Sequence, residues 1–375
     1  MIKDTVFQQL LKPLTTKLIA ECSKRFRSDY DCETFKTADH LRVMIFTHLC
    51  EIKSLRTLET AINGRKIGLS KKMSRSTLSD ANQRRPAQAF IWLLEQLMLL
   101  LPRKKCEEIK EVVRLLDSSP IQLKGRGYEW TKDYATRHIQ GLKLHLEYDL
   151  AFKAPMGMAI SHPNCNDVVM GQRWLIKPDT IYVFDKGYYD FNWWWNIHQQ
   201  GASFVTRLKK NVAICMVKEN ELKGETVLAD GTFRFKNKNP RGGKVNLYQE
   251  PLRRISIERE GKKPLVLVTN RHDLPAQVIG DLYKSRWEIE LFFKWIKQNL
   301  KIKTFLGKSI NAVNIQLATA LIAYLLVLLF KTVTKDKRAL YLVLIWVRHH
   351  LDKKNNHYRT YAPPNYVFSR ERVSL

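Results

Sequence analysis

The spacing of apolar residues along the chain changes near residue 111, and this change restricts the folds that the chain can adopt. Before that point, runs such as LRVMIFTHLCEI and AQAFIWLLEQLMLLL carry apolar residues at helical spacing. After it, short apolar runs such as TIYVF and ASFVTR are separated by turn residues, which is typical of strands. Strands followed by helices predict an α/β or α+β domain, here preceded by a helical region.

The charge balance predicts a polyanionic partner. The 375 residues include 64 Lys and Arg against 36 Asp and Glu, a formal net charge of +28. Such an excess repels itself unless a polyanion offsets it, and nucleic acid is the usual one. A basic protein without such a partner is the alternative. Acidic membranes are a weaker alternative, because the basic residues are spread along the whole chain.

Other features favour a cytoplasmic location. The six cysteines lie far apart without a CxxC pair, as in a reduced protein. The first 26 residues lack the apolar core of a signal peptide. The run LATALIAYLLVLLF at 317–330 is shorter than the roughly 20 residues of a membrane span. We therefore expect it to form a buried core helix, with no membrane as partner.

Two aspartates follow apolar runs and are candidates for chemistry. Asp117 closes VVRLLD, and Asp185 closes TIYVFD, so each is expected at the end of a strand. Taken alone, either residue is more simply a turn or capping aspartate. With a third carboxylate nearby they would repel one another unless they shared divalent cations, for which Mg²⁺ is suited. Two such ions could serve phosphodiester chemistry.

The third carboxylate is expected on the helix predicted at 276–301. At roughly 100° per residue, Tyr283, Arg286, Glu290 and Lys297 fall within an arc of about 60°, whereas Glu288 falls on the apolar side. A stripe with one carboxylate, two cations and a phenol suits a phosphodiester site. The alternative is a solvated face on which Arg286 and Glu290 form an ordinary i,i+4 pair.

A helix-turn-helix-like reader of DNA is one interpretation of the segment SLRTLETAINGRKIGLSKKMSRSTLSDANQRRP. Its second helix would begin at Ser74 or Ser76 and would carry the candidate DNA-binding residues Arg75, Arg84 and Arg85. An ordinary helical bundle with a basic surface explains the same pattern.

Several other polar or aromatic residues have simpler explanations. His162, Asn166 and Asp167 in SHPNCNDVV could approach a metal site, but we interpret them as a cluster that caps a loop. His145 is expected to be a strand residue. The three tryptophans at 193–195 are expected to pack in the core and at the surface.

The spacing Y-x2-R-x3-E-x6-K resembles the signature of a large family of bacterial insertion-sequence transposases. These are DDE enzymes of the Tyr-Arg-Glu-Lys group, the insertion-sequence-four family. LLDSSPIQL resembles the family's first-aspartate block, and VFDKGYYDF with GASFVTRLKKN its second. TNRHDLPAQVIGDLYKSRWEIELFFKWIKQNLKIKTFLG resembles the glutamate block, and MSRSTLSDANQRRP adds to the likeness upstream. Four blocks in this order cover most of residues 1–330.

The resemblance implies a role for each stripe residue and both aspartates. Asp117, Asp185 and Glu290 would be the catalytic and metal-binding triad for Mg²⁺ or Mn²⁺, as two ions. The DNA-binding residues would be Tyr283, Arg286 and Lys297, which would hold phosphates of the transposon end. Many relatives have Arg at the position of Lys186, so we assign that residue no role.

The resemblance also implies an RNase H-like α/β core that is interrupted by a β-rich insertion. We expect a helical DNA-binding region at 1–110, the first part of the core at 111–210 and the insertion at 211–270. The second part of the core with C-terminal helices would occupy 271–351, and a basic polar tail 352–375.

The predicted function is cut-and-paste DNA transposition by a DNA-binding endonuclease that also joins strands. The enzyme would bind the terminal inverted repeats of an insertion sequence, nick the ends and join the 3′-OH to target DNA. Its partners would be double-stranded DNA and a second copy of the chain, in a bacterial cytoplasm at the nucleoid. A nuclease that cleaves without joining and an inactive DNA-binding regulator are the alternatives, with a membrane-surface protein more remote.

Overall fold

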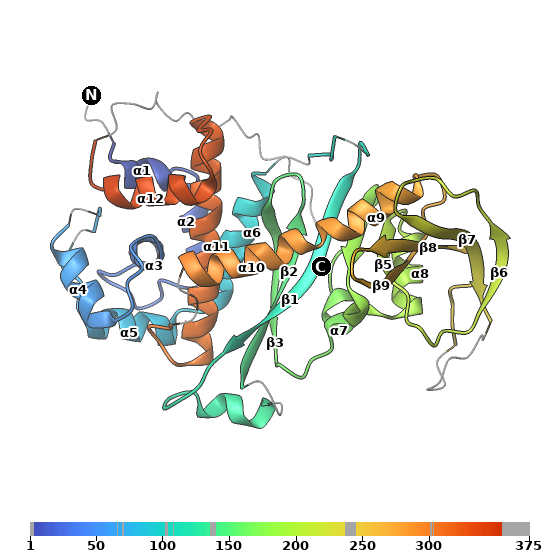
Figure 1. Ribbon diagram of the computed structural model, residues 1–375. Helices are drawn as coiled ribbons and strands as arrows, with labels where there is room; N and C mark the ends of the chain where they lie inside the picture. The colour runs from blue at the N-terminus through green and yellow to red at the C-terminus, as the bar shows by residue number, and fades with distance from the viewer. Residues whose placement is uncertain are drawn as a thin grey trace. The chain divides into compact units, whose positions relative to one another are not determined.

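The chain forms two compact units (Figure 1). The structure, a computed structural model, describes residues 4–65, 67–69, 71–101, 104–107, 109–135, 140–236, 245–300, 302 and 304–354. The first unit contains residues 1–102, 125–130 and 295–375, and the second contains 103–124 and 131–294. Most of the predicted tail at 352–375 lies outside the described residues.

The first unit is helical in its described part, as the amphipathic runs predict. Its helices are α1 (Val6–Leu10), α2 (Thr16–Phe26), α3 (Thr37–Leu49), α4 (Leu55–Asn63), α5 (Arg75–Arg84), α6 (Ala87–Leu99), α11 (Ile310–Val333) and α12 (Leu340–His350). Hydroxyl side chains cap several of them: Thr15 accepts from the N–H of Leu18, and Ser74 from that of Thr77. Such caps satisfy amide groups that have no partner within the helix.

Helix α11 is the centre of this unit. It packs against α3, α6 and α12, and most of its apolar residues are buried. By length and composition it is the one described helix that could cross a membrane, with a mean hydropathy of 2.2, but 83% of that apolar window is buried within the protein. The predicted core helix is therefore confirmed, although it is longer than the apolar run at 317–330.

The second unit contains a single nine-stranded sheet with the strand order β3-β2-β1-β4-β5-β9-β8-β7-β6. Its strands are β1 (Val112–Gln122), β2 (Gly141–Asp149), β3 (Ala154–Ser161), β4 (Thr180–Phe184), β5 (Ser203–Arg207), β6 (Ile214–Glu219), β7 (Val227–Phe235), β8 (Leu252–Arg259) and β9 (Lys262–Thr269). Helices α7 (Asp167–Gly171), α8 (Phe191–Gln199) and α9 (Ala276–Ser285) and the 3₁₀ turn η2 (Lys186–Tyr188) belong to the same unit. The 3₁₀ turn η1 (Glu129–Tyr134) and helix α10 (Trp287–Asn299) span both units.

Strands β1, β4 and β5 run parallel and form the middle of the sheet, while all other pairs are antiparallel. All five residues of β4 are buried, as expected for a parallel strand covered on both faces. The strand-rich stretch at 211–270 joins the same sheet, because β9 pairs with β5. The predicted mixed α/β class is confirmed.

Aromatic residues fill one side of the parallel strands. Trp193 and Trp194 of α8 are buried in a cluster with Leu116, Phe184 and Phe204 of β1, β4 and β5. Register places the side chains of Leu116 and Phe184 side by side. The tryptophans therefore pack in the core, as expected.

The helix predicted at 276–301 is two helices. Helix α9 ends at Ser285 and α10 begins at Trp287, with Arg286 between them. Here the N–H of Arg286 donates to Tyr283 O at 3.2 Å, and the N–H of Ile289 donates to Arg286 O at 3.3 Å. These i→i−3 bonds wind the chain more tightly than an α-helix does.

Candidate active site

Strand register brings Asp117 and Asp185 together. The parallel pairing of β1 and β4 ends at Leu116 and Phe184, and each aspartate is the next residue of its strand. Neighbouring strands lie about 4.8 Å apart, so the two carboxylates emerge side by side at one edge of the parallel layer.

The expectation that Asp117 ends its strand is wrong. Strand β1 continues to Gln122 because β2 pairs with it along that whole length, from Arg114 opposite Asp149 to Gln122 opposite Gly141. It is β4 that ends beside Asp117.

Arg286 connects Asp117 with Glu290. Its Nη1 lies 3.4 Å from Oδ2 of Asp117, and its Nη2 lies 2.5 Å from Oε1 of Glu290. The side chains of Arg286, Asp117 and Glu290 are 15%, 19% and 32% exposed, so the group is open to solvent on one side. Glu288 is not part of it. The Glu288 side chain is 36% exposed, and its carboxylate pairs with Lys153 at 3.5 Å. Its surroundings are therefore more polar than the apolar face on which the helical arc places it.

The other stripe residues lie as follows. Tyr283 is buried at the end of α9, and the Arg286 guanidinium lies 5.8 Å from the centre of its ring. Burial raises the pKa of the Tyr283 phenol, so it stays protonated at neutral pH. Lys297 lies further along α10, in the part of that helix that belongs to the first unit.

The electrostatics of the site favour an added cation. The pKa of Asp117 is raised to about 6. Burial is the largest cause and the charges of Asp185 and Glu290 add to it, while the Ser118 N–H and Arg286 act in the opposite direction. Carboxylates that repel one another in a partly buried place are stabilised by divalent cations, which take oxygen ligands. The donor set therefore fits Mg²⁺ or Mn²⁺.

In this structure Arg286 contacts both Asp117 and Glu290, as a shared metal cation would. Over the described residues, no group of three or more His, Cys, Asp or Glu side chains is close enough to hold an ion as it stands. Metal binding would thus require the bridge between Asp117 and Glu290 to open.

Gly187 keeps space free beside the second aspartate. A Cβ at this position would lie 2.8 Å from Oδ1 of Asp185 and 3.0 Å from Oδ2 of Asp167. The N–H of Gly187 donates to Oδ1 of Asp185 at 2.6 Å, which fixes the orientation of that carboxylate.

Asp167 lies beside the candidate site. It begins α7 and accepts a hydrogen bond from Ser118, the neighbour of Asp117. The sequence signal was an aspartate in SHPNCNDVV, which the loop-capping interpretation explained equally well. His145 is a buried strand residue, as expected.

The three candidate DNA-binding arginines of the first unit have different surroundings. Arg75 is 51% exposed and pairs with Glu59, and Arg84 is 78% exposed and pairs with Asp80. Arg85 is buried and serves the fold: its guanidinium donates to the carbonyl oxygens of Ser28 and Phe35.

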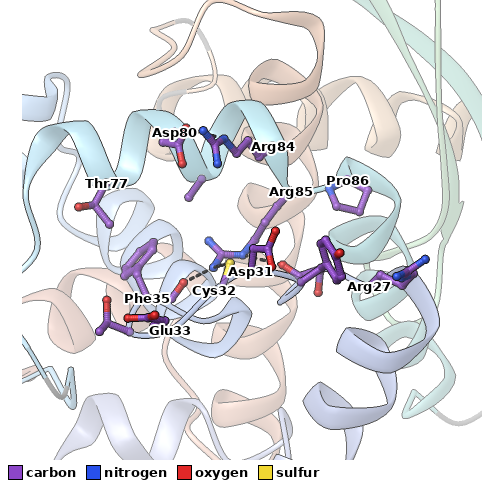
Figure 2. Close-up of a pocket in the computed structure, with 14 residues that line it drawn as sticks. Arg27, Asp31, Cys32, Glu33, Phe35, Thr77, Asp80, Arg84, Arg85 and Pro86 are labelled. Carbon is purple, nitrogen blue, oxygen red and sulfur yellow. Dashed lines mark hydrogen bonds and ion pairs between the residues drawn. The ribbon is translucent and has the colours of Figure 1, made fainter.

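Arg84 and Arg85 both line a hollow of about 380 Å³ between α5 and the loop that follows α2 (Figure 2). In this view the side chain of Arg85 extends toward Cys32, whereas Arg84 lies on α5. The linker between α4 and α5 is held by Asn63, whose side chain bonds both backbone groups of Met73.

A mixed α/β sheet with two carboxylates at the point where the parallel pairing of two neighbouring strands ends, and a third from a helix, points to the class of metal-dependent phosphodiester enzymes. Comparison with known proteins agrees. Residues 108–326 match the family described as Transposase DDE domain, and residues 3–69 match a domain of unknown function (DUF4372).

Named relatives point the same way. The chain is 40% identical over 254 residues to a putative transposase, y4zB, of Sinorhizobium fredii, covering 66% of this chain and 69% of the relative. It is 29% identical over 218 residues to the probable transposase for insertion sequence element IS5377 of Geobacillus stearothermophilus, covering 57% of this chain and 55% of that relative.

A solved structure supports the fold. The piggyBac transposase in a synaptic complex with hairpin DNA matches with a TM-score of 0.53 at 10% identity, over 93% of this chain and 80% of that one. The chain therefore belongs to the family of transposases with a DDE domain, and it is a DDE-type DNA transposase.

Proposed function

We propose that Asp117, Asp185 and Glu290 are the catalytic triad of this transposase. The observation that carries the proposal is the register of β1 and β4, which puts the two aspartates side by side, with Glu290 joined to Asp117 through Arg286. The enzyme would bind the terminal inverted repeats, nick the transposon ends by hydrolysis and use the freed 3′-OH to attack target DNA.

The same three carboxylates would hold Mg²⁺ or Mn²⁺, as two ions. When bound, these cations supply activation of the attacking oxygen and stabilisation of charge on the leaving oxygen. The raised pKa of Asp117, caused first by burial, supports this assignment, because a carboxylate in such a place gains from a nearby cation.

The chain's own cations would position the DNA backbone. A guanidinium can bind a phosphate through two parallel hydrogen bonds, so Arg286 would turn from the carboxylates to the scissile phosphate. Tyr283 would donate its phenolic hydrogen to a phosphate oxygen. Its raised pKa, caused by burial, argues against a nucleophilic role. Lys297 would hold a neighbouring phosphate as a point charge.

The domain roles follow from this assignment. Strands β1–β5 would belong to an RNase H-like core, with 111–210 as its first part, 211–270 as the β-rich insertion, and 271–351 as its second part together with the C-terminal helices. The helical region at 1–110 would read the terminal repeats through Arg75 and Arg84. Two ends must be paired for transposition, so a homodimer would assemble on DNA.

The test is cleavage of a labelled duplex that carries the element's own terminal repeat, with Mg²⁺. Glu290→Gln should abolish nicking, whereas the matched variant Glu288→Gln should cut like the native chain. Nicking by Glu290→Gln at the native rate would refute the triad. Added target DNA separates a transposase from a nuclease, because only the first yields joined strands.

A further inference from the structure

A fourth carboxylate lies next to the proposed triad. Asp167 belongs to a polar group, here called the Asp167 cluster, that consists of Asp167, Ser118, Lys143 and His145. Oδ1 of Asp167 accepts from Ser118 Oγ at 2.7 Å and from Lys143 Nζ at 3.2 Å, and it lies 3.7 Å from His145 Nδ1. Register explains the group, because Ser118 of β1 lies directly opposite His145 of β2.

The cluster is connected to the triad through β1. The N–H of Ser118 donates to Oδ1 of Asp117 at 2.8 Å, while the hydroxyl of the same residue donates to Asp167. Successive side chains of a strand point to opposite faces. Ser118 therefore contacts Asp117 through its backbone N–H and Asp167 through its side chain on the other face.

The second oxygen of Asp167 faces Asp185. Oδ2 of Asp167 and Oδ1 of Asp185 both lie within 3.0 Å of the point that a Cβ on Gly187 would occupy. Among the residues that the structure describes, no side chain or backbone group donates a hydrogen bond to this Oδ2. The Asp167 side chain is 24% exposed, so a ligand can reach it.

Two buried polar atoms beside these carboxylates have no hydrogen-bond partner in the described part of the chain. One is the phenolic oxygen of Tyr188, which is 1% exposed, and the other is Nδ1 of His145, which is 0% exposed. Burial, and then the charges of Asp167, Asp117 and Asp185, raise the pKa of the Tyr188 phenol well above its ordinary value. A buried polar atom without a partner is costly, which points to a ligand or ordered water at this place.

The charge count also points to a cation. Asp117, Asp185, Glu290 and Asp167 supply four negative charges, and Lys143 and Arg286 supply two positive charges. The excess negative charge matches divalent cations, which prefer carboxylate oxygens.

We propose that Asp167 binds one of the divalent cations through Oδ2, together with Asp185. Its Oδ1 stays with Lys143 and Ser118, which fix the carboxylate in place. The competing role is structural, in which Asp167 merely neutralises Lys143. The proposal rests on the proposed function, since it places Asp167 at the metal site of the triad.

The experiment measures Mn²⁺ binding to the full chain without DNA, by calorimetry and by electron paramagnetic resonance. Asp167→Asn keeps the size of the side chain and an oxygen for Ser118 and Lys143, but it removes the charge. It should weaken the binding of one Mn²⁺ ion about tenfold or more. Lys143→Met is the matched control: it removes the ion pair and keeps the carboxylate, so Mn²⁺ affinity should be unchanged or higher.

Each outcome decides between the two roles. If Lys143→Met weakens Mn²⁺ binding as much as Asp167→Asn does, the role of Asp167 is structural and the proposal fails. It fails too if Asp167→Asn binds Mn²⁺ like the native chain. Should Asp167→Asn not fold, the double variant with Lys143→Met removes both charges, and it must still show the weakened site.

Asp185→Asn separates this proposal from the proposed function. Lost Mn²⁺ binding in Asp185→Asn together with native binding in Asp167→Asn refutes only the role of Asp167. Native binding in Asp185→Asn refutes both.

Discussion

Arg286 donates to Glu290 at 2.5 Å across one helical turn, and its other terminal nitrogen lies 3.4 Å from Asp117. The pair is more than an ordinary i,i+4 contact, because the guanidinium also reaches the strand that carries the first aspartate. One side chain therefore balances two carboxylates that would otherwise repel each other in a partly buried place.

Replacing Arg286 by methionine should destabilise the metal-free protein and increase its response to metal. Asp117 and Glu290 then lose their shared cation, which should lower the free energy of unfolding by about 1–2 kcal/mol. Mg²⁺ should restore more stability to this variant than to the native chain. Thermal melting with and without Mg²⁺ checks this, with Arg173→Met at an exposed position as control. An equal response to Mg²⁺ in both proteins would contradict the bridging role.

Gly187→Ala should impair catalysis with little change in stability. The new Cβ would lie 2.8 Å from Asp185 Oδ1 and 3.0 Å from Asp167 Oδ2, so at least one carboxylate must move. Displacing a metal ligand should reduce end cleavage about tenfold or more. Because the position is exposed, the melting temperature should hardly change. Native cleavage rates in this variant would show that the two carboxylates tolerate displacement.

Much of the site could be predicted from the sequence, because local sequence patterns distinguish the positions of its residues. Asp117 and Asp185 each follow an apolar run, and the helical step separates Glu290 from Glu288 without any structure. The break at Arg286 was not predictable, since the segment has no proline or glycine there and its apolar pattern runs through. At this break, with its i→i−3 bonds, Arg286 contacts Asp117, which lies far away in the sequence.

Other features depend on pairing between distant segments. The length of β1 follows from β2, which no local pattern reveals, and this pairing also brings His145 opposite Ser118. For the same reason Asp167 looked like a capping residue: its partners come from β1 and β2. Arg85 looked like Arg84 in sequence, yet one is buried and the other is exposed, because the loop after α2 covers only one of them.

Asp230→Asn should strongly destabilise the second unit. Asp230 of β7 and Arg253 of β8 form two hydrogen bonds, at 2.9 and 2.6 Å, and their side chains are 3% and 8% exposed. The variant leaves a buried guanidinium without its counter-charge, which typically costs about 3–5 kcal/mol. Urea unfolding followed by tryptophan fluorescence measures this. The exposed pair of Glu221 and Lys223 gives the control, since Glu221→Gln should leave stability nearly unchanged.

The exposed arginines of α5 should contribute to DNA affinity through phosphate contacts. Arg75→Gln and Arg84→Gln should each weaken binding to DNA and reduce the slope of log affinity against log salt by about one. Arg85→Gln should instead lower the melting temperature, because it removes hydrogen bonds to Ser28 and Phe35. Binding of a fluorescent terminal-repeat duplex over a range of salt concentrations checks this. Unchanged slopes for both exposed positions would exclude α5 from the interface.

Acid should destabilise the first unit through His40. Its Nε2 lies 3.0 Å from Asn82 Oδ1 and its Nδ1 lies 3.4 Å from Arg85 Nη1, so the neutral ring donates to the amide and accepts from the guanidinium. Burial, and then the charge of Arg85, lower the pKa of His40 from 6.5 to about 3. The unfolded chain therefore binds a proton between these values that the folded chain does not.

Stability should accordingly be full above pH 6.5 and should fall as the pH drops from 6.5 towards 3. At pH 5, the loss of unfolding free energy that His40 causes, relative to neutral pH, amounts to about 2 kcal/mol. His40→Gln should be less stable than the native chain at neutral pH, but its unfolding free energy should depend less on pH in this window. The exposed His349→Gln serves as control and should keep the native pH dependence. Urea unfolding at pH 7.5, 6 and 5 measures the slopes, and equal slopes for His40→Gln and the native chain would contradict a neutral buried ring.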